Sequence, residues 1–165
     1  MKDGDVIQVA HVVRDLDAAM KYFWEVFHIG PWDIYTFGPP DVRDSMVRGK
    51  PSDHKYLLAV TWAGGVQIEL MQPLTGRSVY DEFLEKKGEG LHHIKLYYKD
   101  CQKALEEFKK KGIEVIQSGK FDEDEFYYLD TEASLGTIYE IGNNGKIREP
   151  ERRYPDIRRG CCCQK

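Results

Sequence analysis

Four polar side chains lie in segments that otherwise read as apolar strands: Gln8, Glu69, His93 and Glu140. Glu69 and Glu140 each have apolar or aromatic neighbours on both sides. An ionised carboxylate in such a strand is costly to bury unless it has a partner. A divalent cation is a suitable partner, because carboxylate, imidazole and amide oxygens are hard or borderline ligands. The alternative is that both acids lie on the solvent-exposed face of an antiparallel sheet, where water solvates them.

The four residues occupy matching places in an internal repeat. The segment around Gln8 aligns with the segment around His93 at an offset of 85 residues. The strand that contains Glu69 aligns with the strand that contains Glu140 at an offset of 71 residues. The offsets differ because the loops between them differ in length, and loops tolerate insertions. Since both acids recur at equivalent positions, the repeat favours a shared metal site over two solvated acids.

Each copy of the repeat predicts a strand, a helix and then three strands. Asp15 and Asp100 each follow the first strand, where a carboxylate can accept the free amides of a helix's first turn. Apolar residues follow each of them at helical spacing. The middle strands are expected over residues 32–37 and 55–62 in the first copy and over residues 115–120 and 125–130 in the second.

These elements predict an α+β fold built from two βαβββ modules. The modules are expected over residues 6–75 and 90–145, with a linking helix at 78–87. Together they predict a single domain over residues 1–145, followed by a polar C-terminal tail at 146–165.

Side-chain alternation along a strand separates the two adjacent histidines, because neighbouring residues point to opposite faces. The repeat aligns His93 with Gln8, so His93 is the expected ligand and His92 is expected to pack or to support it. Lys95 follows two residues later on the same face as His93. We expect it either to bind an anionic group of the substrate or to reach water along its apolar stem.

Composition excludes several classes of function. The net charge is −4 and the basic residues are interleaved with acids, so no basic stripe for nucleic acid is present. The most apolar stretch, residues 56–66, is too short to cross a membrane, and residues 1–5 lack the apolar core of a signal peptide. We therefore expect a cytoplasmic protein. The run Cys161–Cys163 in the polar tail has neither a disulfide framework nor zinc-site spacing.

Three runs in order resemble the vicinal oxygen chelate superfamily, which groups glyoxalases, bleomycin-resistance proteins and dioxygenases. They are residues 12–19, 66–74 and 88–94, and residues 136–141 close the set. The resemblance extends over about residues 6–142. The nearest branches are methylmalonyl-CoA epimerase and glyoxalase I (lactoylglutathione lyase). The resemblance implies that the four strands of each module form a glyoxalase-like, eight-stranded curled sheet around a metal site.

The resemblance also implies the ligands of that site, which are the four polar residues named at the outset. The ion would be zinc, cobalt, nickel or magnesium. With glutamine at position 8, the ligand set resembles that of the zinc glyoxalase I. Epimerases carry histidine at this position. However, Val12 and Pro73 occupy the positions at which such glyoxalases hold glutathione with arginine and asparagine. Both branches therefore stay open.

Both branches abstract a proton next to a carbonyl or a thioester. The resemblance implies that Glu69 and Glu140 serve as base and acid while a metal stabilises the enolate oxygen. The implied substrate is an acyl-CoA thioester or a hemithioacetal, and the implied assembly is a homodimer. The site forms either within one chain or between two.

Two other functions are possible on the same fold. A ring-cleaving iron dioxygenase needs two histidines and one carboxylate, and Gln8 replaces one of those histidines. A metal-free protein that binds or sequesters a small molecule has no need of two buried acids. The long loop at residues 38–54 is expected either to cover the substrate as a lid or to lie exposed.

Overall fold

The computed structural model describes residues 1–156, and the Cys161–Cys163 run lies outside them. The first module begins with strand β1 and helix α1 and continues with three long strands. Its elements are β1 (Val6–Val12), α1 (Leu16–Phe27), β2 (Trp32–Phe37), β5 (Lys55–Ala63) and β6 (Val66–Thr75).

The second module repeats this order after a linking helix, α2 (Val79–Lys87). A short helix, α4 (Glu132–Leu135), precedes its last strand. The other elements are β7 (Gly90–Tyr97), α3 (Cys101–Lys110), β8 (Val115–Phe121), β9 (Asp124–Leu129) and β10 (Ile138–Gly142).

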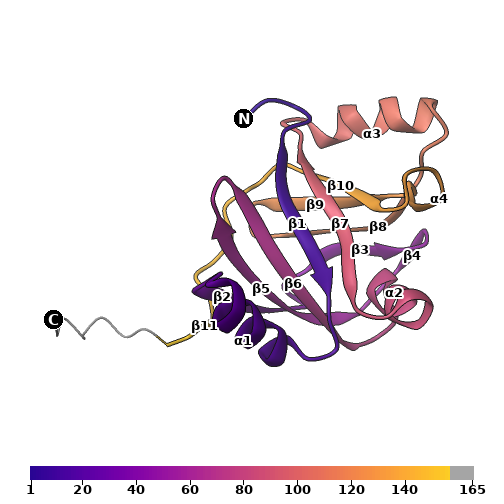
Figure 1. Ribbon diagram of the computed structural model, residues 1–165. Coiled ribbons are helices and arrows are strands. Elements are labelled where there is room, and N and C mark those ends of the chain that lie inside the picture. The colour runs from indigo at the N-terminus through magenta and orange to yellow at the C-terminus, as the bar shows by residue number, and fades with distance from the viewer. Residues whose placement is uncertain (157–165) are drawn as a thin grey trace, which may run out of the picture.

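The sheet joins the two modules through their first strands. Its order is β11-β2-β5-β6-β1-β7-β10-β9-β8-β3-β4, and β1 pairs antiparallel with β7. Within each module the first and last strands run parallel, β1 beside β6 and β7 beside β10. The sheet is strongly curled and open, with the strands of the two modules on either side of β1 and β7 (Figure 1). The predicted α+β architecture of two βαβββ modules that share one curled sheet is confirmed.

The sheet has eleven strands in the described residues, which are the eight expected strands and three more. The expected loop at 38–54 contains a hairpin, β3 (Arg43–Val47) and β4 (Lys50–Pro51), which pairs with β8 of the other module. Strand β11 (Arg152–Tyr154) pairs with β2. The hairpin covers β8 and β11 covers β2, which are the outermost predicted strands of the two modules. The unpaired N–H and C=O groups of such an edge strand favour pairing with a further strand.

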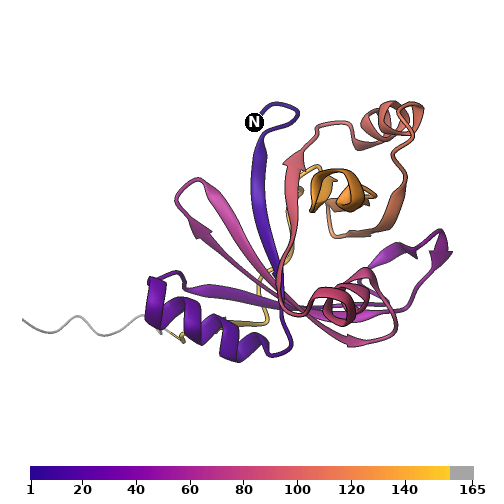
Figure 2. The same ribbon diagram turned by 45° about the vertical axis from the view of Figure 1, so that its right-hand side comes forward.

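The module helices pack on the outside of the curl, far apart from each other (Figure 2). Each begins where the carboxylate of an aspartate accepts a backbone amide, Asp15 from Ala18 at 3.0 Å and Asp100 from Lys103 at 3.0 Å. Helix α1 covers one apolar cluster around Leu16 and Met20, and α3 covers another around Cys101 and Ala104. No helix in residues 1–156 is long and apolar enough to cross a membrane.

A third apolar cluster lies inside the curl and is rich in aromatic rings. It includes Phe37, Tyr56, Phe121 and Tyr128, which come from both modules. Phe37 and Phe121 are in ring contact, with centroids 4.3 Å apart. The two halves of the sheet therefore enclose a shared core, and the polar residues described next lie beside it.

Candidate functional site

Two neighbouring rows of side chains cross the four central strands on the inner face. In the first row Gln67, Gln8, Lys95 and Glu140 are consecutive cross-strand partners on β6, β1, β7 and β10. In the second row Glu69, Ala10 and His93 are partners on the first three of these strands. Because side chains two residues apart share a face, both rows point into the same interior.

The structure brings together the four residues singled out from the sequence, and all four are buried: Gln8, Glu69, His93 and Glu140. The Nε2 amide of Gln8 donates to Glu69 Oε1 at 3.1 Å and to Gln67 Oε1 at 2.6 Å. His93 Nε2 lies 2.7 Å from Glu140 Oε2 and 3.4 Å from Glu69 Oε2. One imidazole nitrogen thus faces both carboxylates, one from each module.

The two carboxyl groups differ in their electrostatic environment. Burial raises the pKa of Glu69, and His93 only partly opposes this effect. Burial also acts to raise the pKa of Glu140, but the Lys95 ammonium and His93 outweigh it and lower the pKa of that carboxyl. Burial lowers the pKa of His93, whereas Glu140 and Glu69 raise it, with a net rise to about 9. Glu140 is therefore the more strongly ionised carboxyl of the pair.

The two adjacent histidines are both buried, although they begin on opposite faces. The β1–β7 register shifts between Ala10 and His11, so that His92 lies in a bulge. Its Nδ1 is 2.9 Å from His93 Nδ1, and its ring packs edge-on against Tyr80 and Phe83 at centroid distances of 5.4 and 5.1 Å. His92 thus packs under α2 and supports the ring of His93 from behind.

Lys95 does not reach out to water. Its Nζ lies 3.0 Å from Glu140 Oε1 and 3.2 Å from Asp124 Oδ2, and the residue is 7% exposed. Asp124 is itself buried, and its second oxygen accepts the amide of Gly145 at 2.9 Å. A buried ammonium between two carboxylates therefore forms part of the site.

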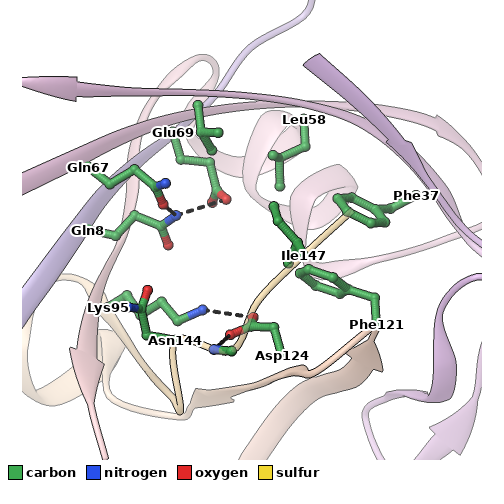
Figure 3. A pocket seen from close by; sticks show the side chains of 12 residues that line it. Gln8, Phe37, Leu58, Gln67, Glu69, Lys95, Phe121, Asp124, Asn144 and Ile147 are labelled. Atoms are coloured by element: carbon green, nitrogen blue, oxygen red, sulfur yellow. Dashed lines mark hydrogen bonds and ion pairs between the residues drawn. The ribbon is translucent and has the colours of Figure 1, made fainter. Parts of the chain in front are cut away.

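A cavity of about 100 Å³ opens beside these residues. Figure 3 shows polar side chains along one side of it and apolar side chains along the other. The polar group contains Gln8, Gln67, Glu69, Lys95, Asp124 and Asn144, and the apolar group contains Phe37, Leu58, Val60, Phe121 and Ile147. Such a cavity suits a small ligand with a polar end and an apolar end.

Residues 143–151 form a strap that crosses from the second module to the first and lines this cavity. At its beginning, Asn143 Oδ1 accepts the amide of Glu125 at 3.1 Å. Farther along, Arg148 donates to the carbonyl of Thr36 at 2.8 Å, and its guanidinium lies over the Phe37 ring at 4.8 Å. In Figure 1 the strap runs from the end of β10 to β11.

The donor set fits a divalent cation in its chemistry. His93 Nε2 is buried and has no aligned hydrogen-bond partner in the described part of the chain, although two carboxylates lie near it. Three carboxylates also face only two basic side chains, Lys95 and His93, so the cluster has an excess of acidic groups, which favours a cation. However, in residues 1–156 no three His, Cys, Asp or Glu side chains are already arranged to hold a metal.

Sequence reasoning missed several members of the site. Gln67 lies two residues before Glu69 on the same strand, so simple alternation predicts that it faces the interior. Asp124 lies just before the predicted strand at 125–130, and the need of a buried lysine for a counter-charge points to an acid in this place. Nothing in the sequence indicates that the strap at 143–151 lines the cavity.

Comparisons with known proteins agree with the fold. Residues 7–128 match the Glyoxalase/Bleomycin resistance protein/Dioxygenase superfamily. Uncharacterized protein YqjC of Bacillus subtilis (strain 168) is 38% identical over 64 residues, which are 39% of this chain and 46% of that protein. The chain thus aligns with less than half of that relative's length.

Solved structures share the fold over most of the chain. Hypothetical protein BH1468 from Bacillus halodurans C-125 superimposes with a TM-score of 0.61 at 20% identity, over 92% of this chain and 99% of that one. Methylmalonyl-CoA epimerase from Mycobacterium tuberculosis superimposes with a TM-score of 0.58 at 18% identity, over 84% and 86%. A methylmalonyl-CoA epimerase in complex with methylmalonyl-CoA and NH4+ superimposes with a TM-score of 0.62 at 17% identity, over 90% and 100%. With its two modules and its matching residues, this chain belongs to the glyoxalase/bleomycin resistance protein/dioxygenase superfamily.

Proposed function

We propose that the protein is a metal-dependent epimerase, isomerase or lyase that moves a proton at the carbon next to a carbonyl or thioester. The observation that carries this proposal is the pair of buried carboxyl groups, Glu69 and Glu140, which face one imidazole and have opposite pKa shifts. Two titratable groups whose environments separate their pKa values are suited to act as an acid and a base.

Glu140 is the proposed base. It is kept ionised by Lys95 and His93, so it can accept a proton without first losing one. Glu69 is the proposed acid, because it lies on the equivalent strand of the other module and faces Glu140 across the His93 imidazole. Positioned groups of this kind typically contribute about 10²–10⁴-fold to the rate.

Gln8, Glu69, His93 and Glu140 are the proposed ligands of a divalent ion. When bound, such an ion would act as a Lewis acid on a carbonyl oxygen of the substrate. The protein side chains then have the tasks of binding, orienting and exchanging the proton. The strap and the apolar wall line the cavity beside them.

The proposed substrate is an acyl-CoA thioester or a hemithioacetal. Several structural relatives are methylmalonyl-CoA epimerases, and one of these structures holds methylmalonyl-CoA. A cavity of about 100 Å³ accommodates only the reacting acyl end of such a molecule, so the carrier has to remain outside. Lys95 lines the same cavity and is the proposed contact for a polar group of that acyl end.

Proton exchange in deuterated water tests this function. We would incubate metal-loaded protein with several acyl-CoA thioesters and hemithioacetals and measure deuterium at the α-carbon by mass spectrometry. The wild type should incorporate deuterium, and Glu140→Gln should abolish the incorporation. Metal content is measured in parallel, since Glu140→Gln also removes a ligand. Exchange by Glu140→Gln at the wild-type rate, or no exchange on any substrate with metal in place, would contradict the proposal.

A second candidate is a metal-free protein that binds a small molecule. It is favoured by the absence, in residues 1–156, of three acidic, histidine or cysteine side chains already set to hold a metal. In that case Lys95 and the protonated His93 together supply the positive charge that faces the carboxylates. Elemental analysis of protein purified without chelator separates the two functions: about one divalent ion per chain supports the enzyme.

A further inference from the structure

Lys95 breaks the symmetry between the two halves of the site. The offset of 85 residues that pairs Gln8 with His93 also pairs Ala10 with Lys95. The antiparallel register of β1 and β7 agrees, because Gln8 lies beside Lys95 and Ala10 lies beside His93. One module therefore places a methyl group where the other places an ammonium group.

As a result, the two equivalent carboxylates are held differently. Both oxygens of Glu140 face nitrogen atoms, Lys95 Nζ at 3.0 Å and His93 Nε2 at 2.7 Å. Glu69 instead accepts from the neutral amide of Gln8 at 3.1 Å, and its other oxygen lies 3.4 Å from His93 Nε2. Glu140 is thus paired with a fixed cation, whereas Glu69 has no ammonium beside it.

Asp124 prevents Lys95 from turning away. Its Oδ2 accepts from Lys95 at 3.2 Å, and its Oδ1 accepts from the strap residue Gly145 at 2.9 Å. If Lys95 moved toward solvent, two buried carboxylates would both lose the ammonium that lies between them, which is strongly unfavourable. The ammonium is therefore a permanent part of the interior.

We propose that Lys95 is a built-in cation that holds Glu140 in place without a metal and competes with a divalent ion for this carboxylate. This inference rests on the metal site of the proposed function. A divalent ion on Glu140 would share the carboxylate with an ammonium that cannot leave, and like charges repel strongly where water is excluded. Lys95 would thereby keep the metal affinity of the site low.

Titration calorimetry with Zn²⁺ tests the competition without any substrate. Lys95→Met should bind Zn²⁺ roughly ten- to hundredfold more tightly than the wild type, the range typical of groups that act on a metal through its ligands. Lys95→Arg keeps the charge and should bind like the wild type. Asp124→Asn removes a negative charge but leaves the ammonium on Glu140, so it should bind Zn²⁺ more weakly.

The double variant Lys95→Met with Asp124→Asn guards against loss of folding. It removes both charges of the ion pair, keeps an acceptor for the Gly145 amide and retains the net charge of the wild-type cluster. We expect it to fold, as judged by circular dichroism, and to bind Zn²⁺ more tightly than the wild type. A merely structural lysine predicts instead that both lysine-free proteins bind no more tightly.

The outcomes separate this inference from the proposed function. If the wild type binds Zn²⁺ and the lysine-free proteins bind it equally well, the inference is wrong and the metal-dependent function stands. If only the lysine-free proteins bind Zn²⁺, the inference holds and the metal-dependent function is wrong. If no protein binds Zn²⁺ up to millimolar concentration, both are wrong.

Discussion

At Gly145 the backbone of the strap passes close to the backbone of the second module. A Cβ atom added there would overlap the carbonyl group of Glu123 and lie 2.7 Å from the amide nitrogen of Asp124. These are backbone atoms, which cannot rotate out of the way as a flexible side chain can. Gly145→Ala should therefore push the strap away from the second module and lengthen the 2.9 Å hydrogen bond from Gly145 to Asp124.

The expected loss of stability follows from these two effects. Forcing an extra methyl group into a packed site costs about 1–3 kcal/mol, and a weakened hydrogen bond costs about 1 kcal/mol. Gly145→Ala should thus lower the free energy of unfolding by about 2–4 kcal/mol. For a chain of this size, this corresponds to a fall in Tm of roughly 5–15 °C.

Thermal and urea denaturation measure this loss, and hydrogen exchange locates it. Gly65→Ala, in the turn between β5 and β6, is a matched control because an added Cβ there meets no atom within 4 Å. The control should change the free energy of unfolding by less than about 0.5 kcal/mol. In Gly145→Ala, amides of residues 143–154 should exchange faster than in the control. Equal stability and equal exchange in the two variants would refute the close packing of the strap.

Three further predictions concern other parts of the molecule. His93→Ala should lose most of the Zn²⁺ affinity of the wild type in calorimetry, whereas His92→Ala should keep that affinity and lower Tm. The reverse result would show that His92, and not His93, is the metal ligand. Burial lowers the pKa of His54 below that of the unfolded chain. Its contribution to stability is therefore complete above the unfolded pKa and is lost as the pH falls below it, with a slope of at most about 1.4 kcal/mol per pH unit. Urea denaturation of His54→Phe between pH 7 and pH 5 should show a shallower loss than the wild type, and an unchanged slope would contradict this. Finally, α1 exposes the apolar side chains of Tyr22, Val26 and Phe27, which a homodimer would cover. Light scattering should therefore give a mass of about twice 19.2 kDa, and a monomeric mass at micromolar concentration would count against the dimer.

The sequence by itself predicted the two modules and most of their elements. Apolar spacing and the aspartates at the helix starts predicted α1 and α3, because these signals act within a few residues of the chain. The repeat then predicted that Gln8, Glu69, His93 and Glu140 face one interior. This worked because side chains alternate strictly along a strand, so equivalent positions in two modules face the same side.

Only the tertiary structure shows which strands pair at the edges of the sheet and in which register β1 and β7 pair at its centre. Which strand covers β2 or β8 depends on segments far away in the sequence, and neither β11 nor the β3–β4 hairpin has a local signal for its partner. The bulge at His92 arises from the register between β1 and β7, and it places a second histidine ring against His93.

The charge balance of the site was also decided in three dimensions. The sequence showed that Lys95 shares a face with His93, and it left open whether the ammonium reaches water or a ligand. The structure instead places the ammonium between Glu140 and Asp124, and the strap supports Asp124 through Gly145. Ion pairs of this kind depend on distances between segments separated by many residues. Alternation along a single strand fixes only the face on which a side chain lies and not the charge that it meets there.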